Sequence, residues 1–252
     1  MSLQLLGLLQ TSMLDYPGRV AATLFTMGCP LRCPYCHNPE LIQGKTPDNF
    51  VPREQVMQHL VRRRQLLQGV AITGGEPLLH QDLPNLIDEI NSLGYPVKLD
   101  TSGVLFAALQ ALLQLQADVS PDAGLQYVAM DVKTLPSLYG RVLPASSEQK
   151  KQDLEASVQS SMEALRQWRD AAGGRRVEFR TTVVPQILSP QELQELAGIF
   201  QPGDTWTLTQ FMPGGCFQPE YNALRPYEID VLQAAAAAVA PGVQVQLRGA
   251  GA

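Results

Sequence analysis

The sequence has little cysteine, no excess of basic residues and no long apolar run. Four cysteines in 252 residues are too few for a disulfide framework. Lysine and arginine number 19 against 24 aspartates and glutamates, which argues against a general nucleic-acid binder. No apolar stretch reaches the roughly 20 residues that span a membrane. The first basic residue is Arg19, so the N-terminal apolar residues make a poor signal peptide, and we expect a cytoplasmic protein without membrane or nucleic-acid partners.

The pattern along the chain predicts an α/β fold. Short β-type runs alternate with segments whose apolar residues recur at helical spacing. The expected strands cover residues 20–25, 70–73, 97–100, 127–131, 177–183 and 206–210, with a further candidate at 243–247. The expected helices cover residues 53–68, 83–93, 105–115, 153–168 and 191–200. This alternation is typical of a parallel sheet with helical crossovers. Its units are too few for a closed eight-unit barrel, so we expect one domain over residues 1–252 with a partial (β/α)6 barrel or an open sheet.

Polar and glycine-rich segments follow most of the expected strands. They begin at Cys29, Gly74, Asp100, Asp131 and Gln210. In a parallel α/β fold the carboxyl ends of the strands share one edge, and ligands bind there. The convergence of these segments predicts an active site at that mouth.

Three cysteines crowd into the loop at residues 28–38. Cys29, Cys33 and Cys36 have the spacing C-x3-C-x2-C. Thiolates prefer soft centres such as zinc, copper(I) or an iron–sulfur cluster. A 4Fe–4S cluster takes one ligand per iron, so three cysteines leave one iron open to a substrate.

Parts of the same loop also match other chemistry. Cys33 and Cys36 have the spacing of a dithiol redox site, and with His37 they spell C-x-x-C-H, the haem attachment pattern. A dithiol site would leave Cys29 without a role. Haem attachment requires export, which the poor signal peptide does not support. Cys29, Cys33, Cys36 and His37 also suggest a zinc site in a non-catalytic adaptor, although His37 directly follows Cys36 and its side chain does not readily reach the same ion.

The cysteine loop resembles that of the radical S-adenosylmethionine (radical SAM) superfamily, with Tyr35 as the aromatic residue before the third cysteine. The wider sequence is similar to the activating enzymes of glycyl radical enzymes. It is most like the activating proteins of anaerobic ribonucleoside-triphosphate reductase, with the pyruvate formate-lyase activases as siblings. The resemblance rests on residues 14–19, 25–29, 36–40, 73–78, 100–103, 131–133 and 183–185. Because no cysteine lies between Cys36 and Gly74, we expect a single cluster.

The resemblance implies an oxidoreductase of anaerobic metabolism. S-adenosylmethionine would bind the open iron, and one electron from the cluster would cleave it to methionine and a 5′-deoxyadenosyl radical. That radical would take a hydrogen atom from a glycine of a partner glycyl radical enzyme, with flavodoxin or ferredoxin as the electron donor. A radical SAM enzyme acting on a small molecule is the alternative.

The resemblance also implies roles for individual residues. Gly74 and Gly75 would let the backbone approach the methionine moiety, and Glu76 would accept a hydrogen bond from its amino group. Tyr35 would contact adenine, and Lys133 would bind the cofactor carboxylate. Asp100 and Asp131 would bind ribose hydroxyls or, together with Thr101 and the carbonyl of Ala129, a monovalent cation. Asp15 would bind the substrate glycine loop. Carboxylate and hydroxyl oxygens suit a hard cation. Arg180, Gln210 and Cys216 receive no role.

Overall fold

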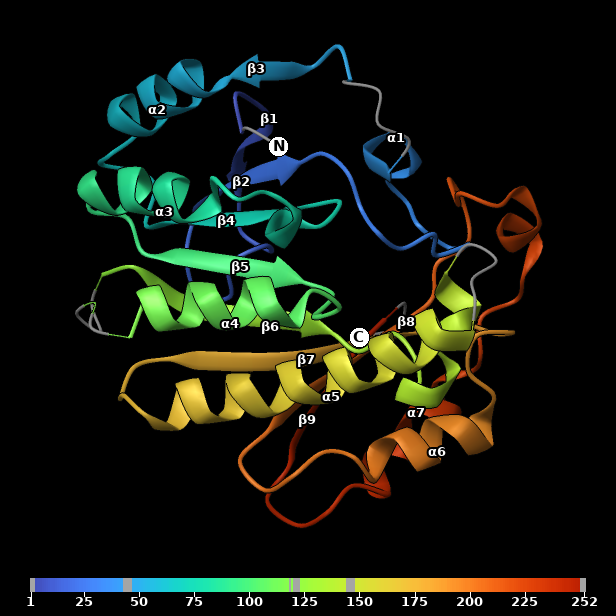
Figure 1. Cartoon of the computed structure of the whole chain (residues 1–252). Helices are drawn as coiled ribbons and strands as arrows, with labels where there is room; N and C mark the ends of the chain where they lie inside the picture. The colour runs from blue at the N-terminus through green and yellow to red at the C-terminus, as the bar shows by residue number, and fades with distance from the viewer. Residues whose placement is uncertain (1–2, 43–46, 118, 120–122, 144–147, 250–252) are drawn as a thin grey trace.

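The strands of the protein form one nine-stranded sheet in the order β3-β1-β2-β4-β5-β6-β7-β8-β9 (Figure 1). The computed structural model describes residues 3–42, 47–117, 119, 123–143 and 148–249. The strands are β1 (Leu5–Ser12), β2 (Ala21–Thr26), β3 (Phe50–Pro52), β4 (Gly69–Gly74), β5 (Val97–Thr101), β6 (Leu125–Asp131), β7 (Arg176–Val183), β8 (Thr205–Gln210) and β9 (Gln244–Arg248). From β2 to β9 all neighbours are parallel, whereas β1 pairs antiparallel with both β2 and β3.

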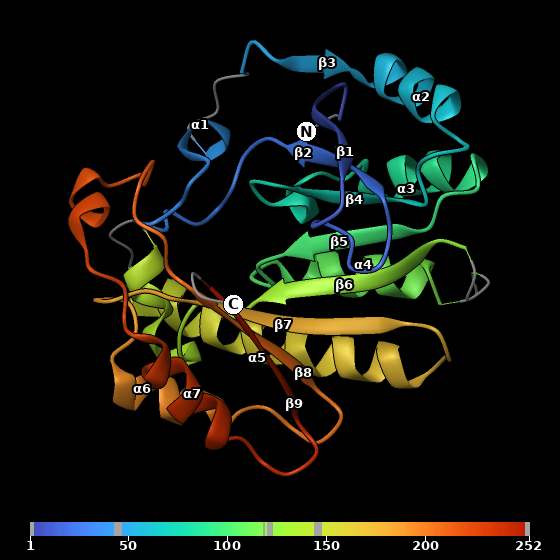
Figure 2. The same ribbon diagram turned by 180° about the vertical axis from the view of Figure 1, so that it is seen from behind.

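The helices connect the parallel strands and cover one face of the sheet. They are α1 (Pro39–Ile42), α2 (Arg53–Arg62), α3 (Leu83–Ser92), α4 (Phe106–Leu115), α5 (Glu148–Asp170), α6 (Pro190–Ala197) and α7 (Ile229–Ala237). Short 3-10 turns occur at η1 (Pro77–Leu79), η2 (Pro136–Val142) and η3 (Pro219–Ala223). Helices α3, α4 and α5 lie in front of the sheet in Figure 1 and behind it in Figure 2, so the opposite face carries no helical layer there.

The predicted parallel sheet with helical crossovers is confirmed, and the strand at 243–247 exists as β9. In the described residues β3 and β9 do not pair with each other, so the barrel is partial. Strands β1 and β3 were not expected, because the exposure pattern of β1 does not alternate regularly and the edge strand β3 has three residues. The predicted helix at 53–68 is too long. It ends at Arg62 because the amides of Leu66 and Leu67 turn back to the carbonyl of Arg63.

Alternation along the strands gives the sheet two unlike faces. Val70, Ile72 and Leu99 are fully buried and pack in the core with side chains of the helices. On the intervening positions of β5 stand Lys98 and Asp100, which face the other side. Because neighbouring strand residues point to opposite faces, one face becomes an apolar core and the other a polar interior. No helix in the described part of the chain has the length and apolarity to cross a membrane.

Candidate active site

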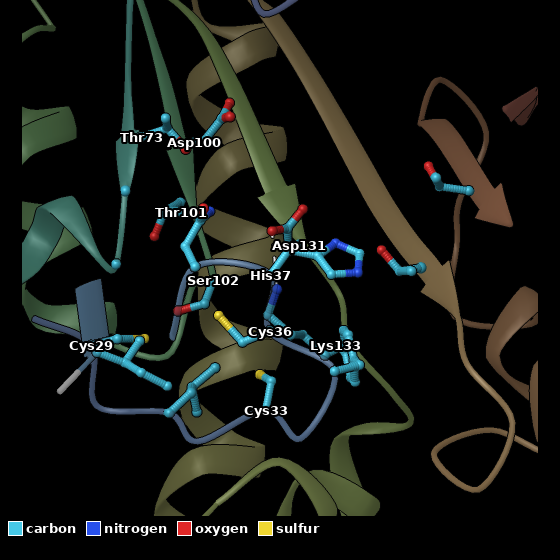
Figure 3. Close-up of a pocket in the computed structure, with 18 of the residues that line it drawn as sticks. Cys29, Cys33, Cys36, His37, Thr73, Asp100, Thr101, Ser102, Asp131 and Lys133 are labelled. Atoms are coloured by element: carbon cyan, nitrogen blue, oxygen red, sulfur yellow. Dashed lines mark hydrogen bonds and ion pairs between the residues drawn. The ribbon is translucent and has the colours of Figure 1, made fainter. Parts of the chain in front are cut away.

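A cavity of about 420 Å³ lies where the parallel strands end (Figure 3). The loop after β2 and the carboxyl ends of β4 to β8 form its walls. The predicted site residues that line it are Cys29, Cys33, Tyr35, Cys36, Gly74, Gly75, Asp100, Thr101, Asp131 and Lys133. Glu76 and Asp15 are not among its lining residues. The strand ends therefore meet at one mouth, as the sequence predicts.

The cysteine loop presents three free thiols to this cavity. In Figure 3 the side chains of Cys29, Cys33 and Cys36 lie around the same space, below Thr101 and Ser102. Burial raises the pKa of Cys29 to about 11 and that of Cys33 to about 12. Thiolates in such a site need a compensating positive centre, because burial disfavours the charged form.

Backbone hydrogen bonds fix the shape of the loop. Nη1 of Arg32 donates to the carbonyl of Cys29 at 2.6 Å. From the segment after β8, the amide of Phe217 donates to the carbonyl of Cys36 at 2.9 Å, and that of Gln218 to the carbonyl of Pro34 at 2.8 Å. The loop is thus held by one of its own side chains and by a segment that lies about 180 residues further along the chain.

His37 is engaged outside the thiol cluster. Its Nε2 lies 3.0 Å from the carbonyl oxygen of Met212, and its ring stacks on Phe211 with 6.4 Å between the ring centroids. In the described residues no three histidine, cysteine, aspartate or glutamate side chains come close enough to share one metal ion. The arrangement therefore does not favour a mononuclear Cys3His zinc site.

Gly74 and Gly75 allow the turn after β4 to lie directly against the start of the cysteine loop. A Cβ on Gly75 would lie 2.0 Å from the carbonyl oxygen of Gly28. A Cβ on Gly74, whose φ is +129°, would lie 2.2 Å from the amide nitrogen of Thr26. The sequence predicts that glycine is needed for close approach to the cofactor, and the structure adds that it is needed for contact between these two segments.

The carboxylate of Glu76 ties strand ends together. It is fully buried and accepts hydrogen bonds from Thr101 Oγ1 at 2.8 Å, from the amide of Ser102 at 2.8 Å and from the Ser102 hydroxyl. The amide of Leu78 donates to it at 3.2 Å. Burial raises the pKa of Glu76 despite these donors. All of these partners belong to the chain, and the predicted contact of Glu76 with the amino group of a cofactor stays a prediction.

Asp100 and Asp131 face a set of side-chain cations. Nη1 of Arg180 lies 3.3 Å from Oδ2 of Asp100, and its Nε lies 2.8 Å from Oδ1 of Asp131. Lys98 pairs with Asp100, and Lys133 Nζ lies 3.0 Å from Asp131 Oδ2. Burial alone would raise the pKa of Asp131, but the charges of Arg180 and Lys133 lower it below its usual value. Asp131 is therefore ionised, and both carboxylates have cationic partners.

The predicted monovalent cation site stays a prediction. The carboxylates of Asp100 and Asp131 pair with the chain's own cations, and the hydroxyl of Thr101 donates to Glu76. A bound cation would therefore have to share these carboxylates with Lys98, Lys133 and Arg180.

Asp15 lies away from the cavity, on the turn between β1 and β2. Its Oδ2 accepts a hydrogen bond from the hydroxyl of Thr23 at 2.7 Å. That turn precedes β2, whereas the cysteine loop follows β2, so Asp15 and the cysteines approach the polar interior from opposite ends of the strand. The predicted contact of Asp15 with a substrate loop stays a prediction.

Some lining residues were not identified as site residues from the sequence. They are Thr73, Ser102, Thr182, Thr209 and Met212. Three of them are threonines in β4, β7 and β8. These threonines could have been found from the alternation along the strands, because every second residue of an inner strand faces the polar interior. Cys216, in contrast, is buried outside the cavity lining, with its amide bonded to Asn222 Oδ1 at 2.9 Å.

Comparison with known families agrees with the site. The sequence profile of the Radical SAM superfamily matches residues 23–198. The chain belongs to this superfamily. Members of the family hold a 4Fe–4S cluster and use S-adenosylmethionine, so this radical SAM protein is an enzyme with those cofactors.

Individual relatives of this radical SAM enzyme have related names. A protein of Methanocaldococcus jannaschii named as a glycyl-radical enzyme activating enzyme is 24% identical over 222 residues, covering 86% of this chain and 84% of that protein. The pyruvate formate-lyase-activating enzyme of Staphylococcus epidermidis is 36% identical over 93 residues, covering 35% of this chain and 37% of that one. These similarities agree with the resemblance found in the sequence.

A solved structure supports the fold. The crystal structure of Streptococcus suis SuiB bound to S-adenosylmethionine superposes with a TM-score of 0.60 at 15% identity, covering 90% of this chain and 49% of that one. This chain thus spans about half the length of SuiB. At this identity the similarity concerns the fold.

The residues present fit a 4Fe–4S cluster of the family type. Three free thiols line one cavity, and no three metal-binding side chains of the described part converge on a single ion. Cys29, Cys33 and Cys36 would each bind one iron of such a cluster and leave the fourth iron open to a further ligand.

Proposed function

We propose that this radical SAM enzyme generates a glycyl radical on a partner enzyme, most fittingly an anaerobic ribonucleoside-triphosphate reductase. The observation that carries the proposal is the similarity to a protein named as a glycyl-radical enzyme activating enzyme, which extends over 86% of this chain and 84% of that one. Full-length similarity bears on the whole activity, whereas a match to the cysteine loop alone bears only on the cofactors. The choice of ribonucleotide reductase rests on the sequence resemblance.

The cysteines would hold the cofactors and start the reaction. Cys29, Cys33 and Cys36 are the proposed ligands of the 4Fe–4S cluster. When bound, the cluster would supply the electron for reductive cleavage of S-adenosylmethionine, which would provide the radical chemistry needed to take a hydrogen atom from a glycine Cα of the partner. A flavodoxin or ferredoxin is the proposed electron donor.

The remaining cavity residues would orient S-adenosylmethionine. Lys133 is the proposed partner of its carboxylate, because the ammonium lies at the cavity wall beside Asp131. Asp100 and Asp131 are proposed to accept hydrogen bonds from ribose hydroxyls. Arg180 pairs with both carboxylates, whose oxygens act as hydrogen-bond acceptors. Tyr35, which is 7% exposed and lines the cavity, offers a ring face for adenine.

The open sheet suits a protein segment as substrate. Strands β3 and β9 do not pair in the described residues, so hydrogen-bonded strands do not enclose the polar interior on that side. An extended glycine loop inserted there would need acceptors for its amides, and a carboxylate such as that of Asp15 supplies them. Once inserted, the loop would exclude water from the reacting atoms, which protects a radical from side reactions.

The test is anaerobic reconstitution followed by reaction with candidate partners. The reconstituted enzyme, reductant and S-adenosylmethionine are incubated with an anaerobic ribonucleotide reductase or, in parallel, with pyruvate formate-lyase. The expected result is 5′-deoxyadenosine together with a glycyl doublet in the electron paramagnetic resonance spectrum of the reductase. A variant of the partner with alanine in place of its radical glycine is the control.

Each outcome separates the parts of the proposal. A glycyl signal only in pyruvate formate-lyase would keep the activase and change the partner. Deoxyadenosine without a glycyl signal in either partner would favour a small-molecule substrate. A reduced, iron-loaded enzyme that does not consume S-adenosylmethionine would overturn the proposal as a whole.

A further inference from the structure

A second cavity, of about 280 Å³, lies at the other end of the strands from the cysteines. Its walls include the first residue of each of β7, β8 and β9, namely Arg176, Thr205 and Gln244. Because these strands are parallel, their amino ends share the edge opposite to the active-site mouth. The second cavity is therefore separate from the proposed catalytic centre.

Arginine dominates the charge of this cavity. The lining contains four arginines, at positions 169, 175, 176 and 248, and a single carboxylate, that of Glu178. The chain as a whole carries a formal net charge of −5. The cavity is thus locally rich in positive charge although the protein as a whole is acidic.

Two of the arginines have clear structural roles. Arg169 pairs with Asp170 and Asp204, and it donates to the carbonyl of Gly203 at 2.9 Å. Arg175 donates to the backbone carbonyls of residues 168, 116 and 117, at 3.1, 3.1 and 2.8 Å. Those carbonyls are neutral, so the bonds fix the guanidinium of Arg175 without cancelling its charge.

The other two arginines are not explained in this way. Arg176 makes one long hydrogen bond, at 3.4 Å to the carbonyl of Pro17, and its guanidinium lies 4.5 Å from the ring centroid of Tyr127. Arg248 pairs with Glu178 at 2.9 Å, with 42% of its side chain exposed. Among the described residues Arg176 thus makes only this one hydrogen bond, although it lines the cavity.

The single carboxylate does not balance these charges. Glu178 also accepts hydrogen bonds from the hydroxyls of Tyr127, at 2.6 Å, and Thr207. Within the described chain no carboxylate pairs with Arg175 or Arg176. The cavity therefore has a surplus of positive charge, held in place partly by bonds to backbone carbonyls.

We propose that this cavity binds a small phosphate-bearing anion with at least two negative charges. The planar guanidinium offers paired donors that match phosphate oxygens, so several arginines around one space are suited to a polyanion. Thr205, Gln244 and Gln246 add a hydroxyl and two amides at the same wall. The site goes beyond the proposed radical chemistry and requires neither the cluster nor the partner enzyme.

The experiment is calorimetric titration of the iron-loaded enzyme with inorganic pyrophosphate. S-adenosylmethionine is present throughout, so that the probe does not compete at Lys133. We expect saturable one-site binding that weakens as salt is raised. Arg176→Ala is expected to weaken binding at least tenfold, and Arg176→Lys less than Arg176→Ala, because lysine keeps the charge without the paired donors. Arg62→Ala, which removes the same charge from the exposed end of α2, is the matched control and leaves binding unchanged.

A parallel titration with adenosine diphosphate distinguishes a free anion from a nucleotide. Binding of both probes with similar affinity supports a site for the anion alone, and tighter binding of the nucleotide supports a site that also contacts the nucleoside. Absence of saturable binding by either probe would overturn the proposal. Equal losses in Arg176→Ala and Arg62→Ala would overturn it as well, since they would indicate general attraction to a charged surface. Iron content and S-adenosylmethionine cleavage are expected to be unchanged in Arg176→Ala, so this test stands apart from the proposed function.

Discussion

Arg180 Nε lies 2.8 Å from Oδ1 of Asp131, in the polar interior of the partial barrel. The same guanidinium also reaches Asp100, at 3.3 Å. These two carboxylates end neighbouring strands, so one side chain of β7 fixes the ends of β5 and β6. The side chains of Arg180 and Asp131 are 20% and 33% exposed, so solvent screens the pair only in part.

Replacing Arg180 with glutamine is expected to lower the free energy of unfolding by about 2 kcal/mol, because both carboxylates lose a counter-charge. This loss is smaller than the roughly 3–5 kcal/mol for fully buried pairs, because solvent partly screens the pair. Asp131 has a pKa below its usual value in the folded protein. Its contribution is therefore present above the unfolded pKa, about 3.9, and is lost as the pH falls through the folded value. The stabilities of wild type and Arg180→Gln in urea unfolding should differ by a constant amount above about pH 4 and approach each other as the pH falls further toward the folded pKa. Arg62→Gln is the charge-matched control, and a constant difference across pH would contradict this assignment.

Each cysteine of the loop should be required for the cluster, whereas the fourth cysteine should not. Cys29→Ala, Cys33→Ala and Cys36→Ala are expected to lose most bound iron and all 5′-deoxyadenosine formation, because each removes a thiolate ligand. Cys216→Ala, a change at a buried thiol outside the cavity lining, should keep about four irons per chain, the content of one 4Fe–4S cluster. Iron and sulfide analysis of anaerobic preparations measures both. Loss of iron in Cys216→Ala would show that the ligand set is wrong.

A methyl group at Gly75 should displace the cysteine loop. In Gly75→Ala the new Cβ would lie 2.0 Å from the carbonyl oxygen of Gly28, and one of the two segments must move. We expect a loss of about 1–3 kcal/mol in the free energy of unfolding, as for other overpacked sites, and reduced iron loading. Gly173→Ala is the matched control, since nothing lies within 4 Å of the position of its Cβ. Equal thermal stability and iron content in the two variants would rule out the close contact.

The amino end of α6 offers a separate test of local structure. The hydroxyl of Ser189 accepts from the amide of Glu192 at 3.2 Å, and the carboxylate of Glu192 accepts from the amide of Ser189 at 2.8 Å. Ser189→Ala is expected to cost about 1 kcal/mol, as for other helix caps. Ser92→Ala is the control, because that exposed hydroxyl donates only to the carbonyl of Glu89 near the end of α3. Chemical unfolding of the two variants compares them directly, and equal stabilities would show that the cap contributes little.

The same cap predicts a pH dependence. Hydrogen bonds from Arg141 and from the amide of Ser189 lower the pKa of Glu192 to about 2 from the usual 4.5. A lowered folded pKa means that stability is fully present above the unfolded value and is lost as the pH falls toward the folded one. The cost of Glu192→Gln should therefore be largest above pH 4.5 and fade toward pH 2. Unfolding curves at a series of pH values measure this, and a difference that persists at pH 2 would contradict it.

The positions of the parallel strands could be read from the sequence, because apolar and polar residues alternate in a pattern that tertiary packing preserves. In β5, Val97 and Leu99 enter the core while Lys98 and Asp100 face the interior. The mouth of the barrel followed from the same argument, since strand ends of a parallel sheet must converge. The cysteine spacing then predicted which chemistry occupies that mouth.

Pairings between distant side chains could not be read in this way. Arg180 meets partners 49 and 80 residues away, and no local pattern fixes which strand end its guanidinium reaches. The contact of Glu76 with a cofactor stays a prediction, whereas its four hydrogen bonds from donors within the chain could not be inferred from the sequence. Strand β1 was missed because its buried and exposed residues do not alternate regularly, and the edge strand β3 was missed because three residues carry little periodic signal.

The amides of Phe217 and Gln218 have a consequence for how the enzyme is assembled. The family profile ends at residue 198, before these two donors, although they hold the carbonyls of Cys36 and Pro34. A protein shortened to the matched region would retain every cysteine of the motif and lose the clamp behind it. We therefore expect loading of the metal centre to require that residues 217–218 are already folded against the cysteine loop.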